Sequence, residues 1–122
     1  MTEATTLPAP VQAAVPTATE RFAFDNQGYL VLESFLAPDH VARLRAAVTR
    51  AVPRRRELAR TGQKQTGFTH TKSEKSTRFF YMLDDDPLFL ELLDWPALLP
   101  YVHALINPKP HHHGSDVIVT GA

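Results

Sequence analysis

The sequence contains no cysteine. This absence excludes a disulfide framework, a zinc knuckle, an iron–sulfur cluster and a thiol nucleophile. It gives no information about the redox state of the compartment. With 122 residues, of which 43 % are hydrophobic and 21 % are charged, the chain has the length and composition of one modest globular domain.

Long apolar runs and early positive charges are also lacking. No apolar stretch approaches the roughly 18–20 residues that span a bilayer. The first basic residue is Arg21, and no compact apolar segment precedes it, so the N-terminus is a poor secretory signal. Glu3 disfavours a mitochondrial presequence as well. We therefore expect a cytoplasmic protein that makes no contact with a membrane.

The N-terminal stretch differs in composition from the rest of the chain. Residues 1–19 are mainly Ala, Pro and Thr, with few apolar side chains. Such a stretch buries too little surface to offset its chain entropy, which predicts a disordered tail. The predicted domain then covers residues 20–122.

One strand and one helix are predicted in the first half of this domain. Apolar residues that follow an Asn–Gly turn favour a β-strand over residues 29–34. Pro38 suits the first helical position, and apolar residues then recur at spacings of three and four, which predicts a helix to about Val52. Pro53 should kink or end that helix. The apolar pattern disappears over residues 54–77, which is typical of a functional or mobile connection.

Four further elements are predicted in the second half. They are a strand or buried segment over residues 78–83, two short helices over 87–93 and 96–106 that each begin with Pro, and a β-branched strand over 116–120. Together the elements predict an α+β fold. The last strand either docks on the earlier strands or pairs with polypeptide absent from this sequence, and its unpaired edge then favours self-association.

Charge is distributed unevenly along the chain. The segment from Arg43 to Arg78, called the basic segment below, holds eleven basic and two acidic residues, hence a net charge of +9. Five acidic residues follow without a base: Asp84, Asp85, Asp86, Glu91 and Asp94. The basic segment has two interpretations, a site for an anionic partner or a solvated helix face and loop. Nucleic acid is disfavoured because Phe68 is the only aromatic residue there that offers base stacking.

Histidine and aspartate clusters were considered as metal sites. His111, His112 and His113 precede Asp116, but adjacent side chains of an extended strand point to opposite faces, so a polar turn is favoured over a metal site. The run from Asp84 to Asp86 lacks the spacing of a calcium loop, and a helix cap at Pro87 is favoured instead. No metal-ligating residue and no catalytic residue is assigned.

Four segments, taken in order, resemble a known family. Residues 24–32 (FDNQGYLVL) and 35–44 (FLAPDHVARL) resemble the opening of phytanoyl-CoA dioxygenase-type proteins, where a Gly-Tyr strand precedes a helix entered through a Leu-x-Pro-acid step. Residues 86–102 are similar to the helical pair before the core barrel of that family, and residues 114–119 (GSDVIV) resemble its first core strand. The resemblance spans about residues 20–122.

The resemblance implies the N-terminal helices and first strands of a double-stranded β-helix (jelly-roll) enzyme. Such enzymes use Fe(II), 2-oxoglutarate and O₂ to hydroxylate a small or coenzyme A-linked substrate, and hold the iron on a His-x-Asp/Glu pair and a distant His. No His-x-Asp or His-x-Glu occurs in this sequence. We therefore expect an incomplete jelly roll that ends before the metal-binding motif, binds neither Fe(II) nor 2-oxoglutarate tightly and is inactive alone.

Two residues are predicted by the resemblance to bind the cosubstrate. Arg78 matches a basic residue that helps to hold 2-oxoglutarate in some members of the family. Asp116 falls on the inward-looking part of the first core strand, where side chains approach cosubstrate or substrate. The alternative function is a non-catalytic module that binds an anion through the basic segment (residues 43–78), and a third hypothesis is a gene fragment without function.

Overall fold

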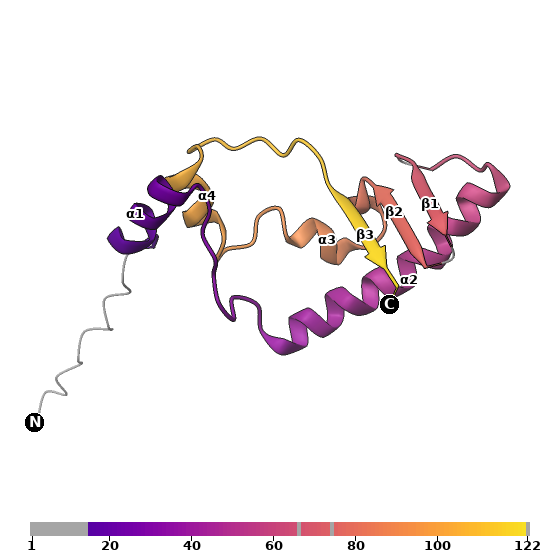
Figure 1. The fold of residues 1–122 in the computed structure, drawn as a ribbon, viewed down its shortest axis with the longest axis horizontal. Coiled ribbons are helices and arrows are strands. Elements are labelled where there is room, and N and C mark those ends of the chain that lie inside the picture. Colours follow the sequence, from indigo (N-terminus) through magenta and orange to yellow (C-terminus); the bar gives the residue numbers. More distant parts are fainter. Residues whose placement is uncertain (1–14, 66, 74, 122) are drawn as a thin grey trace, which may run out of the picture.

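A computed structural model describes residues 15–65, 67–73 and 75–121. Helices and strands are mixed, as the predicted α+β class requires (Figure 1). The elements in chain order are α1 (Ala18–Gln27), α2 (Pro38–Thr61), β1 (Thr69–Ser73), β2 (Ser76–Phe80), the 3-10 helix η1 (Met82–Asp84), α3 (Pro87–Glu91), α4 (Leu99–Leu105) and β3 (Asp116–Thr120). The tail predicted for residues 1–19 lies mostly outside the described residues, and α1 begins just before the predicted start of the domain.

The three strands form one antiparallel sheet with β2 in the centre. β1 and β2 form a hairpin with a register shift between Thr71 and Ser73. β3 is separated from β2 by both short helices and pairs with it over its whole length, from Ser76 opposite Thr120 to Phe80 opposite Asp116. The last strand therefore docks on the earlier strands along one edge, and its other edge has no partner among the described residues.

Helix α2 is longer than the sequence pattern predicts. Pro53 was predicted to kink or end the helix, and the second of these alternatives is wrong: α2 continues to Thr61 and is closed by Gly62 in the left-handed conformation. Residues 54–61, predicted as part of a loop, are thus helical. Good helix formers follow the proline, and tertiary contacts of Arg55 beyond it offset the lost backbone hydrogen bond.

The predicted strand over residues 29–34 is absent, and this prediction is wrong. The helix α1 lies directly before residues 29–34. It begins with a capping box formed by Thr17 and Glu20 and ends at Gly28, which is in the left-handed conformation. Residues 29–34 form a connection that turns at Ser34, whose φ is 49°. Among the described residues, no strand pairs with this segment, and its Leu side chains line an apolar cavity with residues of α4. Apolar burial against a helix therefore replaces strand pairing.

The buried core is small and lies mainly between α2 and α3. Ala47 from α2 packs with Leu88 and Phe89 from α3, and partly buried side chains surround them: Leu44, Val48, Met82, Leu83 and Leu92. The prediction that the aspartate run caps the Pro87 helix is confirmed, since the Asp86 carboxylate accepts from the Leu88 N–H at 2.9 Å. That hydrogen bond, helped by Arg50, holds the pKa of Asp86 below its usual value.

The elements form two groups around α2 (Figure 1). The sheet and α3 lie along this helix, whereas α1 and α4 pack together beyond its N-terminal end. A long connection from α4 returns the chain to β3. Across the described residues, no helix has the length and apolar character needed to cross a membrane.

Replacing Pro53 with Ala tests whether tertiary contacts hold α2 together. Pro53 is exposed, so Ala removes little packing and restores a helical hydrogen bond. We expect Pro53→Ala to raise the free energy of unfolding by about 1–3 kcal/mol, measured by urea denaturation. A loss of stability would show that the helix depends on the proline in this place.

Candidate functional site

The two faces of the sheet have different surroundings. Alternate residues of β2 point to opposite sides, and Thr77 and Phe79 point toward α2, where both are buried. The Arg56 Nε donates to the Thr77 hydroxyl at 2.6 Å. On the opposite face of β2, Arg78 is exposed. We call this opposite side the open face.

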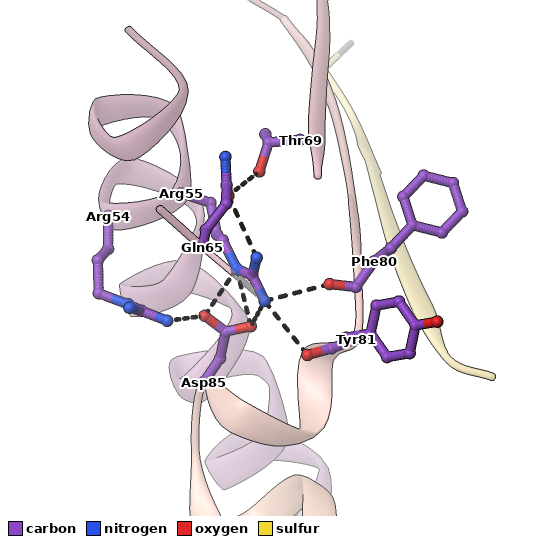
Figure 2. A network of polar contacts seen from close by, with 7 residues as sticks. All are labelled: Arg54, Arg55, Gln65, Thr69, Phe80, Tyr81 and Asp85. Carbon is purple, nitrogen blue, oxygen red and sulfur yellow. Dashed lines mark hydrogen bonds and ion pairs between the residues drawn. The ribbon is translucent and has the colours of Figure 1, made fainter. Parts of the chain in front are cut away.

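A buried ion pair attaches α2 to the turn that follows β2 (Figure 2). The Arg55 side chain is 1 % exposed, and the Asp85 side chain is 0 % exposed. The Arg55 Nε donates to both carboxylate oxygens at 3.0 Å, and Nη2 donates to Oδ2 at 2.8 Å. Arg54 pairs with the same carboxylate from the solvent side. The acidic turn after β2 is thereby bound to the C-terminal part of α2.

The remaining donors of Arg55 are also used (Figure 2). Nη2 donates to the carbonyl oxygens of Phe80 and Tyr81 at 3.1 and 3.2 Å, which satisfies backbone at the end of β2. Nη1 donates to the Gln65 side-chain oxygen, which also accepts from the Thr69 hydroxyl. Burial of a charge is tolerated only with such complete pairing. This network therefore fixes how the sheet sits on α2.

Arg78 lies at the centre of the open face. The register places His70 of β1 directly opposite Arg78 on one side and Ile118 of β3 on the other. With Ser76, these residues line a hollow of about 340 Å³. A guanidinium, an imidazole and a hydroxyl thus border the same cavity, together with the apolar Ile118. Such a mixture of few polar groups and apolar surface is typical of a small-molecule site.

The structure brings together Arg78 and Asp116, the two residues predicted to bind a cosubstrate. The Arg78 Nε donates to the Asp116 Oδ2 at 2.8 Å, and Nη2 lies 2.6 Å from the same oxygen. The guanidinium also lies over the Phe80 ring, 4.6 Å from its centroid. Arg78 is therefore held in place on two sides, one aromatic and one anionic.

Acidic side chains pair with much of the basic segment. In the part of the chain that the structure describes, five of its arginines form ion pairs, and the partners of three are Asp85 and Asp86 from the acidic run. The five are Arg50, Arg54, Arg55, Arg60 and Arg78. This pairing weakens the argument for an anion-binding module, which depended on unbalanced charge along residues 43–78.

A second cavity lies between α1 and α4. Its volume is about 220 Å³, and its lining is mainly apolar: Phe24, Leu30, Leu32, Leu98, Tyr101, Val102, Leu105 and Ile106. The Tyr101 hydroxyl donates to a Glu20 carboxylate oxygen at 2.9 Å and so links the two helices. The Thr17 backbone N–H, and to a smaller extent Tyr101, lower the pKa of Glu20, while the same contact raises the pKa of Tyr101.

The described residues contain no group of three His, Cys, Asp or Glu side chains that would hold a metal ion. His111, His112 and His113 lie on the exposed connection before β3. His40 is buried and stacks on Trp95, with ring centroids 4.1 Å apart. Both of its ring nitrogens lack a hydrogen-bond partner within the described residues. The residues described here therefore do not fit the iron site that the resemblance implies.

Sequence reasoning missed several residues that shape the site. His70 was placed in a loop, although its alternation with Phe68 was a weak signal for a strand. Asp85 was assigned only to a capping cluster, and its partner Arg55 only to a run of positive charge. No local pattern identifies this pair, because 30 positions separate the two residues.

Comparison with models of known protein families, with curated proteins and with solved structures finds no match.

Replacing Asp85 with Asn tests the buried network. The substitution leaves the Arg55 charge buried without its counterion, so we expect the free energy of unfolding to fall by about 3–5 kcal/mol in urea denaturation. The double variant Arg55→Met/Asp85→Leu should recover only part of this loss, because it removes the unpaired charge but leaves the Phe80 and Tyr81 carbonyls without their donor. Glu57→Gln, which breaks an exposed ion pair on the same helix, should leave the midpoint unchanged. A loss no larger than that of this control would contradict the role of Asp85.

The hydrogen bonds that Glu20 accepts from the Thr17 backbone N–H and from Tyr101 predict a dependence on pH. Because the folded state lowers the pKa of Glu20, its stabilising contribution is present above the ordinary glutamate pKa of about 4.3 and is lost as pH falls through the folded value. We expect a carboxyl NMR titration of Glu20 to have its midpoint below the ordinary value, and Tyr101→Phe to raise it. A Glu20 titration midpoint at or above the ordinary glutamate value would contradict these hydrogen bonds.

Proposed function

We propose that this chain forms the N-terminal part of an Fe(II)/2-oxoglutarate oxygenase of the phytanoyl-CoA dioxygenase-like type. In this proposal, the open face of the sheet points into a jelly roll, and Arg78 binds a carboxylate of 2-oxoglutarate. The observation that carries the proposal is the one-sided sheet: α2 covers one face, and the other presents an arginine beside a hollow.

Exposed apolar side chains support the jelly-roll part of the proposal. On the open face, Ile118 is 60 % exposed, and Phe68 is also exposed where it packs on Phe80. Apolar side chains gathered on one face of a sheet are typical of a surface that another layer covers. A double-stranded β-helix supplies such a layer as its second sheet. The helix α2 would then form the outer side of the domain.

The surroundings of Arg78 support a carboxylate ligand. Its planar guanidinium has the geometry that recognises carboxylates, and it already holds one, that of Asp116. Stacking on Phe80 orients the group before any ligand binds. The hollow of about 340 Å³ has room for a small dicarboxylic acid. His70 and Ser76 line the same space and offer further hydrogen bonds.

The proposal assigns no iron ligand to these 122 residues, because they contain no His-x-Asp or His-x-Glu. This part of the protein supplies binding and orientation of the cosubstrate, and no chemical step is assigned to its side chains. The small or coenzyme A-linked substrate and the cytoplasmic location remain part of the same proposal. We expect the purified chain with Fe(II) and 2-oxoglutarate to form no succinate.

Binding of 2-oxoglutarate to the full chain tests the proposal. We expect weak binding that isothermal calorimetry or ligand-observed NMR detects, and a loss of affinity of about tenfold or more in Arg78→Gln. This size follows from removal of a charge-assisted hydrogen bond worth about 1.5–3 kcal/mol.

Arg60→Gln is the matched control, since Arg60 is also exposed and ion-paired but lies on the other side of the sheet, on α2. This control should bind 2-oxoglutarate like the natural chain. Equal binding by the natural chain and Arg78→Gln would refute the assignment of Arg78, and absence of binding would refute the proposed cosubstrate site.

A further inference from the structure

We infer that Asp116 acts as an internal competitor for the cosubstrate. Its carboxylate occupies on Arg78 the position that a ligand carboxylate takes, so binding exchanges one carboxylate for another. The inference rests on the proposed function, which assigns Arg78 to 2-oxoglutarate, and adds a regulating residue to the same site. It reverses the role expected for Asp116 from the resemblance, that of a direct cosubstrate contact.

The geometry of the ion pair leaves the exchange accessible. Both contacts of Arg78 reach the same oxygen, Oδ2 of Asp116, at 2.8 and 2.6 Å. Within the described residues, Nη1 of Arg78 makes no hydrogen bond, so an incoming carboxylate meets an available donor before Asp116 leaves. The two side chains are 48 % and 35 % exposed. Exposed ion pairs of this kind contribute little to stability and are replaced at low cost.

Both residues are anchored by contacts that the exchange does not disturb. The Arg78 guanidinium is held over Phe80, so it keeps its position when the aspartate turns away. Asp116 is the first residue of β3, and its backbone is fixed by pairing with Phe80 and by the hydrogen bond from Tyr81 N–H to the Ser115 carbonyl at 2.9 Å. Release of Arg78 therefore requires only rotation of one short side chain.

The other arginine–aspartate pair of the sheet region shows the contrast. Asp85 is fully buried and accepts from both Arg54 and Arg55, and Arg55 also holds backbone carbonyls. Breaking this pair would leave charges without solvent or partner. Among the described residues, the Arg55–Asp85 pair on the covered side is thus permanent, and the Arg78–Asp116 pair on the open face is exchangeable. Of these two pairs, only the exchangeable one contributes a residue, Arg78, to the lining of the hollow.

The test compares 2-oxoglutarate and succinate binding to the full natural chain and to Asp116→Asn and Asp116→Ala. Removing the competing charge should tighten both ligands by about two- to fivefold, the fold-change that corresponds to an exposed ion pair. Two-dimensional amide NMR spectra report whether each variant keeps the fold. Two different substitutions are used so that the test still stands when one variant does not fold. Glu57→Gln, which breaks another exposed pair, should leave both affinities unchanged.

The outcomes separate this inference from the proposed function. Tighter binding in the Asp116 variants that is lost again when Arg78→Gln is added supports both. Unchanged or weaker binding in folded Asp116 variants, with binding by the natural chain intact, overturns the competitor role and leaves the proposed function standing. No binding of either acid to the natural chain or to any Asp116 variant overturns both.

Discussion

The arrangement of this domain depends on one buried ion pair, Arg55 with Asp85. It joins the C-terminal part of α2 to the turn that follows the central strand, and it satisfies backbone carbonyls at the strand end. The hydrophobic core is small, since the buried apolar side chains among the described residues are Ala47, Ala51, Phe79, Leu88 and Phe89. A polar network therefore contributes much of what orients the sheet. Its satisfied donors specify a single docking geometry.

The same constraint determines which face of the sheet is available for binding. Arg55 and Arg56 of α2 donate hydrogen bonds to residues of β2. The side chains of Thr77 and Phe79 are therefore buried against α2. The alternation of a strand then places Arg78 on the opposite side. The proposed cosubstrate site and the exchangeable Asp116 are thus consequences of how α2 is attached. A change of one residue in register would bury Arg78 and expose Phe79.

The sequence predicted the elements whose signals are local. The segments of β2, β3, α3 and α4 were recognised within a few residues of their observed bounds, and the capping role of Asp86 was confirmed. The errors occur where distant contacts decide. Local rules for Pro53 predict a break, but contacts 30 positions away keep α2 intact. Residues 29–34 have strand propensity but no neighbouring strand.

The candidate site was predictable in part. Arg78 and Asp116 were selected from the resemblance alone, and the structure adds that they contact each other. Arg78 and Asp116 meet because of the register in which β3 pairs with β2. No local sequence pattern determines that register. The position of His70 beside Arg78 depends on sheet pairing as well, because its strand lies in a segment where alternation with Phe68 is only a weak signal. Which residues are neighbours across strands becomes known only when the order and register of the strands are known.

The most direct test of this account locates the ligand on the sheet. Nuclear Overhauser effects between the methylene protons of 2-oxoglutarate and the protein should appear at the Ile118 methyl groups and the His70 ring, which flank Arg78. Contacts with α2 side chains of the basic segment instead, or with the apolar cavity between α1 and α4, would contradict a site on the open face.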